Sequence, residues 1–173
     1  REGGENASYS REFAFSKSTG RPAVLNTKPN DSYTFEGASL LVDGYHSRPV
    51  FTSGAWLGYL DEPLDVTIDM GGEQSYRSVE LETLAEKGDW IFPPSSVTVW
   101  VSDNGTDFTE VASVAVPEAK AGDADGIGRY RMQFPETSAR YLKVVAQNAA
   151  AIPAWHPGAG SKGFLFVDEV VVE

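Results

Sequence analysis

The chain contains 173 residues, of which 41% are hydrophobic and 12% aromatic, so it is long and apolar enough to bury the core of one domain. Its 25 acidic and 14 basic side chains give a formal charge of −11, which repels phosphate backbones and anionic membranes over most of the surface. We therefore expect no nucleic-acid partner and no membrane insertion. The absence of cysteine excludes disulfides, thiolate zinc sites and cysteine nucleophiles.

Residues 1–20 form a polar stretch rich in Gly, Ser and Glu, whose only large anchors are Tyr9, Phe13 and Phe15. This composition predicts a linker or a loosely docked lead-in. The packed domain is expected to begin near Arg21 and to span residues 21–173.

Beyond Arg21 the hydrophobic residues recur at every second position, as strands with one buried face require. Turn signals separate these runs at residues 71–72 (GG), 102–108 (SDNGTDF) and 121–128 (AGDADGIG). Residues 81–90, LETLAEKGDW, are expected to form a strand that runs into a loop. Short strands at this spacing favour an all-β sandwich. The clearest alternating runs are Leu64, Val66, Ile68 and Met70; Val97, Val99 and Val101; and Tyr130, Met132 and Phe134.

Three blocks of sequence carry a family resemblance: SLLVDGYHSRPVFTSGAWLGY at 39–59, SSVTVWVSDNGTDFTEVA at 95–112, and ARYLKVVAQNAAAIPAWHPGAGSKGFLFVDEVVV at 139–172. Together they resemble the discoidin, or F5/8 type C, domain family over residues 21–173. The WHPGAG…FLFVDE ending and residues 88–105 are similar to family 32 carbohydrate-binding modules and to the C-terminal module of Bacteroidetes β-N-acetylhexosaminidases. The resemblance implies a jelly-roll sandwich of the galactose-binding-domain-like type, in a bacterial protein that is secreted, periplasmic or on the cell surface.

The same resemblance implies a structural cation, usually Ca²⁺, beside the early Asp-Gly. It makes Asp43 and Glu169 the carboxylate ligands, which suits an ion that takes six to eight oxygens. Many relatives continue Asp-Gly-Asn with a Thr shortly after, whereas Tyr45, His46 and Ser47 follow here. The hydroxyl ligand is therefore open among Ser47, Thr52 and Ser53. The alternative is that Asp43 only caps a turn and Glu169 lies in solvent.

A sugar site needs an aromatic face for the apolar side of a pyranose and polar groups for its hydroxyls. Trp90 and Trp155 lie in Pro- and Gly-rich loops, and each serves either as a ligand platform or as a loop anchor. Trp56 and Trp100 are instead expected to be packing residues. The polar ligand contacts predicted around the two loop tryptophans are His46, Arg48, Asn148 and His156.

Neither His46 nor His156 lies in a metalloprotease-like or nucleophile-elbow motif, so we expect no catalysis by this chain. The predicted function is a non-catalytic carbohydrate-binding module of a secreted glycoside hydrolase, taking a terminal galactose, GlcNAc or GalNAc at the loop edge. Its other partner is the catalytic domain of the parent chain, and the isolated domain is expected to be a monomer. The alternative is a structural accessory domain that packs on the catalytic domain and binds no free ligand.

Overall fold

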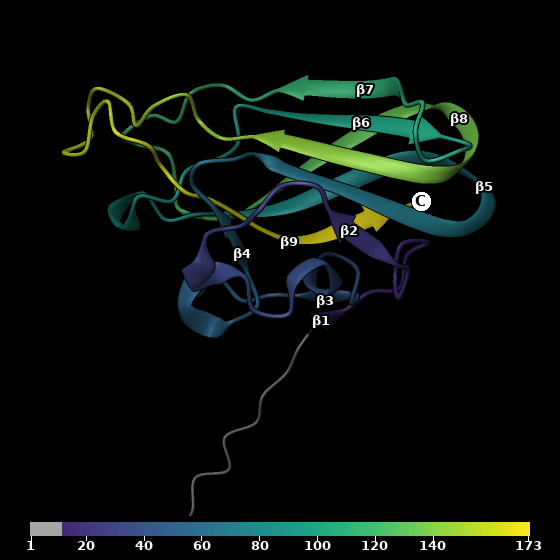
Figure 1. The fold of residues 1–173 in the computed structure, drawn as a ribbon. Helices are drawn as coiled ribbons and strands as arrows, with labels where there is room; N and C mark the ends of the chain where they lie inside the picture. Colours follow the sequence, from purple (N-terminus) through teal and green to yellow (C-terminus); the bar gives the residue numbers. More distant parts are fainter. Residues whose placement is uncertain (1–11) are drawn as a thin grey trace, which may run out of the picture.

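The regular elements of the fold are strands and short 3₁₀ turns (Figure 1). The computed structural model describes residues 12–173, and among them no helix is long and apolar enough to cross a membrane. The all-β prediction is confirmed. The strands are β1 (Glu12–Phe13), β2 (Ala23–Leu25), β3 (Tyr45–His46), β4 (Leu57–Tyr59), β5 (Leu64–Ala85), β6 (Ser96–Ser102), β7 (Thr109–Ala115), β8 (Gly126–Gln147) and β9 (Leu165–Val172). The 3₁₀ turns are η1 (Asp31–Tyr33), η2 (Gly37–Leu41), η3 (Phe51–Ser53) and η4 (Lys87–Asp89).

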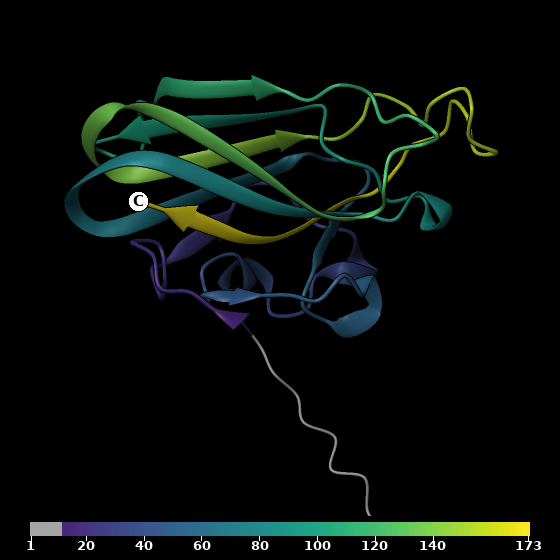
Figure 2. The same cartoon turned by 180° about the vertical axis from the view of Figure 1, so that it is seen from behind.

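Two long strands, β5 and β8, build the sandwich because each passes from one layer into the other (Figures 1 and 2). The first half of β5 pairs with the second half of β8, and this layer also holds β2, β6 and β7. The second half of β5 pairs with the first half of β8 and with β9, which β4 extends. The ladder shifts register between Asp69 and Gln74, where Gly71 adopts φ +80° and the strand turns the corner.

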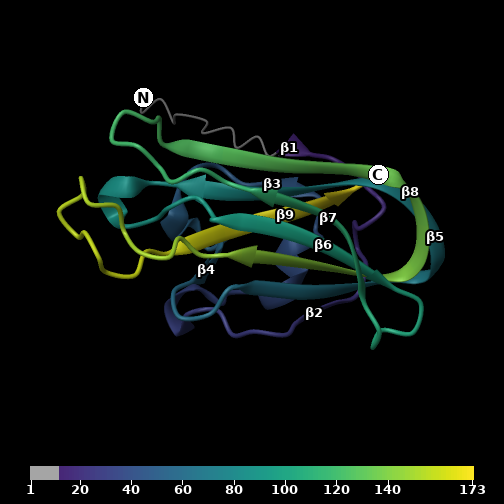
Figure 3. The same ribbon diagram turned by 90° about the horizontal axis from the view of Figure 1, so that it is seen from above.

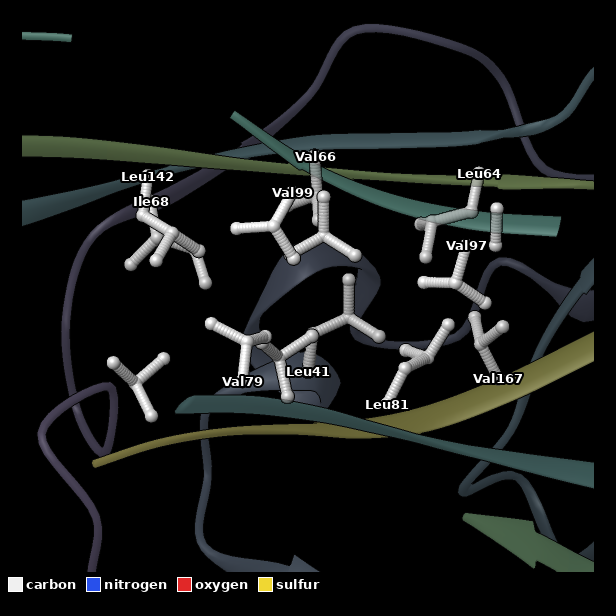
Figure 4. Close-up of a cluster of buried hydrophobic side chains, with 14 of the residues drawn as sticks. Leu41, Leu64, Val66, Ile68, Val79, Leu81, Val97, Val99, Leu142 and Val167 are labelled. Carbon is white, nitrogen blue, oxygen red and sulfur yellow. The ribbon is translucent and has the colours of Figure 1, made fainter. Parts of the chain in front are cut away.

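The core lies between the two layers and is filled by the alternating residues of the long strands (Figure 4). Each of the three alternating runs places its side chains on the inner face, and Leu64, Val66 and Ile68 have no exposed surface. The predicted one-faced burial is therefore confirmed. The turn expected at 102–108 joins β6 to β7 as a hairpin, and β5 runs into η4 as predicted for residues 81–90.

A second apolar cluster covers the outer face of the β4, β9 and β5 layer. It contains Trp56, Leu84, Ile91 and Phe166, so Trp56 is the packing residue that the sequence predicts. Trp100 differs from the prediction because it alternates with the inward valines of β6 and therefore lies on the outer surface. There the Lys143 ammonium sits 5.5 Å from the centre of its ring.

The predicted lead-in is docked from residue 12 onward. The Ser18 hydroxyl is buried and donates 2.6 Å to the Val170 carbonyl, and the Lys17 N–H donates 2.9 Å to the Val172 carbonyl. Packing therefore begins before Arg21, because β1 pairs with β3 and this segment lies along β9. Residues 1–11, including Tyr9, lie outside the described residues.

Candidate functional site

The loop end, which we define as residues 86–92, 116–125 and 149–164, lies at the edge of the sandwich away from the β5–β8 corner (Figure 3). Buried Lys87 ties two of its loops together. Its ammonium donates 2.8 Å to the Asp123 carbonyl and forms an ion pair with Asp125. Although burial alone raises the pKa of Asp125, the contacts with Lys87 outweigh it and hold that pKa below its ordinary value.

His156 fixes the third loop from a buried position. Its Nδ1 accepts the Gly158 N–H at 3.0 Å, so the proton lies on Nε2, which donates 2.9 Å to the Lys87 carbonyl. The imidazole is also in edge contact with Trp90, Phe92 and Trp155, at ring distances of 6.0, 5.5 and 5.6 Å. The prediction that His156 contacts a ligand is not supported by this placement, because both ring nitrogens are used within the protein.

Trp90 and Trp155 flank His156 and keep 42% and 39% of their surfaces exposed. The Trp155 indole N–H donates 3.0 Å to the Ala119 carbonyl, which leaves its ring faces for other contacts. Trp90 has φ +65°, a strained left-handed conformation for a bulky residue. The Trp90 ring lies so close to Gly158 that a Cβ there would come within 2.8 Å of it. The two tryptophans are thus both anchored and partly open.

An apolar cavity of about 340 Å³ lies beside Trp155. It is lined by Phe92, Pro94, Pro117 and Ile152 together with the alanines of residues 149–151. These apolar side chains, with Glu118 as the charged residue among the lining residues, suit a methyl group or the apolar face of a ring.

Two carboxylates, Glu86 and Asp89, closely precede Trp90 in the chain. Glu86 is partly buried and Asp89 is exposed. Burial raises the pKa of Glu86, and the negative charge and hydrogen bond of Asp89 raise it further. These groups can accept hydrogen bonds from hydroxyls, and they make the surface unfavourable for an anionic ligand.

A second assembly, the carboxylate cluster of Asp43, Glu82, Asp168 and Glu169, lies beneath β3. Glu82, Asp168 and Glu169 are each only 1% exposed. Burial raises the pKa of Asp168 to about 8 and that of Glu169 to about 9, with Asp43 among the negative neighbours that add to both. Such buried acids are costly unless a positive charge or a proton neutralises them.

The donors that reach the carboxylate cluster are few. The Ser47 N–H donates 2.7 Å to Asp168 and the Ser47 hydroxyl also bonds that carboxylate, while both Glu169 oxygens share the Gly44 N–H at 3.3 Å. Glu82 Oε2 lies 2.9 Å from His46 Nδ1 and also accepts from Arg129 at 2.9 Å. Its other oxygen has no hydrogen-bond partner among the described residues.

Sequence reasoning missed Glu82 and Asp168 because strand alternation predicts one inward and one outward residue at each step. In β9 both Asp168 and Glu169 are buried, since the β5–β9 ladder shifts register between Leu81 and Thr83 and β3 covers the outer face. The adjacent acids in the FVDEVV motif are the one signal that could have pointed to the cluster.

The other predicted site residues are distributed between the two assemblies. His46 belongs to the carboxylate cluster, and exposed Arg48 accepts the Trp56 indole N–H at its carbonyl, 2.9 Å away. Half-buried Asn148 donates 3.1 Å to the Tyr59 carbonyl and ties β8 to β4. None of these contacts involves the Trp90 and Trp155 rings.

The predicted calcium ligands are only partly brought together. Asp43 accepts the Tyr45 N–H at 2.8 Å, and Glu169 contacts the N–H of the adjoining Gly44. The Ser47 hydroxyl lies 3.3 Å from the Ala55 carbonyl, and Thr52 is exposed in η3. In the part of the chain that the structure describes, no three His, Asp or Glu side chains are grouped closely enough to hold a metal ion by themselves.

A family model described as the F5/8 type C domain matches residues 25–162. No curated protein matches the chain.

Several solved structures share the fold. The module CpGH89CBM32-5 from Clostridium perfringens, solved in complex with GalNAc-β-1,3-galactose, is 16% identical with a TM-score of 0.60, covering 94% of this chain and 99% of that one. Chitosan-binding module 1 from a chitosanase/glucanase of Paenibacillus sp. IK-5 is 17% identical with a TM-score of 0.58, covering 92% and 99%. A Streptococcus pneumoniae fucose-binding module is 22% identical with a TM-score of 0.55, covering 91% and 94%.

Proposed function

Since the chain belongs to the F5/8 type C domain family, we propose that it is a non-catalytic carbohydrate-binding module whose sugar site is the loop end. The observation that carries this proposal is the pair of half-exposed tryptophans, Trp90 and Trp155, held on either side of buried His156. Keeping a tryptophan at φ +65° costs backbone energy, and such strain is concentrated at functional sites.

The ring faces of Trp90 and Trp155 would receive the apolar face of a pyranose, and the neighbouring cavity would take an N-acetyl methyl group. Glu86 and Asp89 would accept hydrogen bonds from sugar hydroxyls. The same carboxylates disfavour acidic sugars, so the ligand class is a neutral terminal sugar such as galactose, GlcNAc or GalNAc. A shallow site with few buried contacts should bind at about millimolar strength.

The proposal is tested by NMR titration of the tryptophan indole N–H signals with galactose, GlcNAc, GalNAc, fucose and chitotriose. We expect the Trp90 and Trp155 signals to shift, and Trp90→Ala and Trp155→Ala each to weaken binding by about tenfold, as stacked aromatic contacts do. Trp100→Ala is the matched control, because Trp100 lies on the outer face of β6.

No response to any of these sugars would overturn the proposal and would favour the structural alternative, a domain that packs on a catalytic domain without a free ligand. An equal loss of binding in Trp100→Ala would also count against the loop end.

We further propose that the chain is the accessory module of a secreted bacterial glycoside hydrolase and is monomeric by itself. Its WHPGAG…FLFVDE ending supports this proposal through its similarity to modules that follow hexosaminidase catalytic domains. Tethering would raise the local concentration of glycan at the active site. Removing the module should then slow hydrolysis of a polymer while leaving that of a small soluble substrate unchanged.

For the carboxylate cluster we propose a structural Ca²⁺ held by Asp43 and Glu169. The buried and poorly bonded Glu169 carboxylate supports a cation at this place, since Ca²⁺ prefers oxygen ligands and would supply the missing positive charge. With the Ser47 hydroxyl bonded to Asp168 and Ala55 and Thr52 exposed, the remaining oxygens would be backbone carbonyls. The ion would stabilise the loop that carries Asp43.

A further inference from the structure

A second concave surface, the corner groove, is lined by residues of β5, β8 and the C-terminal segment. Figures 1 and 3 show the place where β5 and β8 turn between the layers, next to the C-terminus. The volume of the groove is about 980 Å³, and its walls include Phe15, Lys17, Arg77, Arg131 and Glu173. The Arg77 N–H donates 2.7 Å to the Glu173 carbonyl, which ties β5 to the residue that follows β9.

The corner groove gathers positive charge in a chain whose formal charge is −11. Lys17, Arg77 and Arg131 line it together, against Glu136 and Glu173. This local excess of cations differs from the carboxylates that precede Trp90 at the loop end. By charge complementarity, the groove favours a ligand that carries an acidic group.

The groove already holds one carboxylate of the protein itself. The Arg131 guanidinium donates to the Glu173 carboxylate at 2.5 Å and to the Ser78 hydroxyl at 3.2 Å. Lys17 donates its ammonium to the Ser75 carbonyl. Exposed Arg77 makes no side-chain hydrogen bond or ion pair with any residue from 12 to 173, so its guanidinium is available to a second acid.

Other lining residues suit a sugar ring. Phe15 is 83% exposed at the lip of the groove and offers a face to the apolar side of a pyranose. Exposed Gln133 and Glu136 provide a donor and acceptors for hydroxyl groups. An aromatic face, amide and carboxylate groups, and the Arg77 guanidinium together match a pyranose that bears an acid.

We propose that the corner groove is a second glycan-binding site, which takes an acidic sugar and pairs its anionic group with Arg77. A long polyanion is a poorer fit, because the acidic remainder of the surface repels it while only three cations attract it. The site is independent of the loop end. The module would therefore hold neutral and acidic units of a glycan at opposite edges.

The experiment is an NMR titration of the whole chain with trigalacturonate, with its methyl ester as the neutral matched probe. We expect signals of Phe15, Arg77 and Gln133 to shift with trigalacturonate only, and binding to weaken as salt rises. Arg77→Gln should weaken binding by about tenfold, the loss of one charge-assisted contact. Phe15→Ala should weaken it less.

Lys28→Gln is the control with the same change of charge, since Lys28 pairs with Asp31 away from the groove. Its binding should equal that of the unmodified chain. A sulfated galactose trimer is the second acidic probe. Tighter binding of either acidic probe at Arg77 supports the site, and the tighter one shows whether the site prefers a carboxylate or a sulfate.

Equal binding of the methyl ester, equal losses in Lys28→Gln and Arg77→Gln, or no shift at the groove with either acidic probe would each overturn the proposal. Failure here is distinguishable from failure at the loop end, because the neutral-sugar titration monitors the indole signals of Trp90 and Trp155.

Discussion

The loop end and the carboxylate cluster both join residues far apart in the chain, but they differ in how their polar groups are satisfied. At the loop end, His156 and Lys87 are buried with their nitrogens bonded, and the aromatic faces are left open. In the carboxylate cluster, Asp168 and Glu169 are buried with few donors. The loop end is thus preorganised by the chain alone, whereas the cluster needs protons or a cation.

The largest effect is expected from His156→Ala, which removes two buried hydrogen bonds and the ring that Trp90 and Trp155 contact. We expect a loss of about 3 kcal/mol in the free energy of unfolding, together with loss of neutral-sugar binding. Chemical denaturation measures the first effect and NMR titration the second. Because the loop end needs no ion, the loss should be the same with Ca²⁺ and with a chelator.

Glu169→Gln should change the free energy of unfolding in opposite directions with and without Ca²⁺. In chelator, replacing a buried acid by its neutral isostere removes repulsion and should raise the free energy of unfolding by about 1 kcal/mol. In Ca²⁺, the variant should lose the stabilisation that ligand binding gives the native chain. Thermal melts in both conditions test this, with Glu173→Gln as a surface control. An equal melting temperature of the native chain in Ca²⁺ and in chelator would contradict the proposed ion.

The chelated protein should lose stability as pH rises. Because the pKa of Asp168 is about 8 and that of Glu169 about 9, the folded state keeps protons that the unfolded chain releases near pH 4. Stability from these groups is therefore complete below about pH 4 and declines until about pH 9.

The pH effect is measured by denaturation at pH 5 and pH 8. We expect a difference of at least about 1 kcal/mol that is smaller in Glu169→Gln. An identical pH dependence in the variant would exclude Glu169 as a source.

The smallest effect is expected from Asp89→Asn. Burial and the neighbouring Asp89 both raise the pKa of Glu86, so removing the second cause should lower that pKa without returning it to its ordinary value. NMR titration of the Glu86 carboxyl carbon measures the change, and the free energy of unfolding should stay within about 0.5 kcal/mol. An unchanged pKa of Glu86 in Asp89→Asn would show that the two carboxyls do not interact.

Local pattern sufficed for most of the fold. Alternation at period two located the inner faces of β5, β6 and β8, because strand geometry alone sets that period. The same alternation predicts that Trp100 faces outward, although Trp100 was expected to be a packing residue. The Pro- and Gly-rich surroundings of Trp90 and Trp155 correctly indicated loops.

The sequence by itself therefore determined the all-β class, the strand faces and the aromatic loops, since these depend on neighbours a few residues away. Only the tertiary structure decided that His156 is buried, that Asp168 lies beside Glu169 in the interior, and that Lys17, Arg77 and Arg131 share a groove. Each of these outcomes requires segments that are far apart in the sequence to meet. Burial and charge at such meeting points depend on long-range pairing and strand register, which no local pattern encodes.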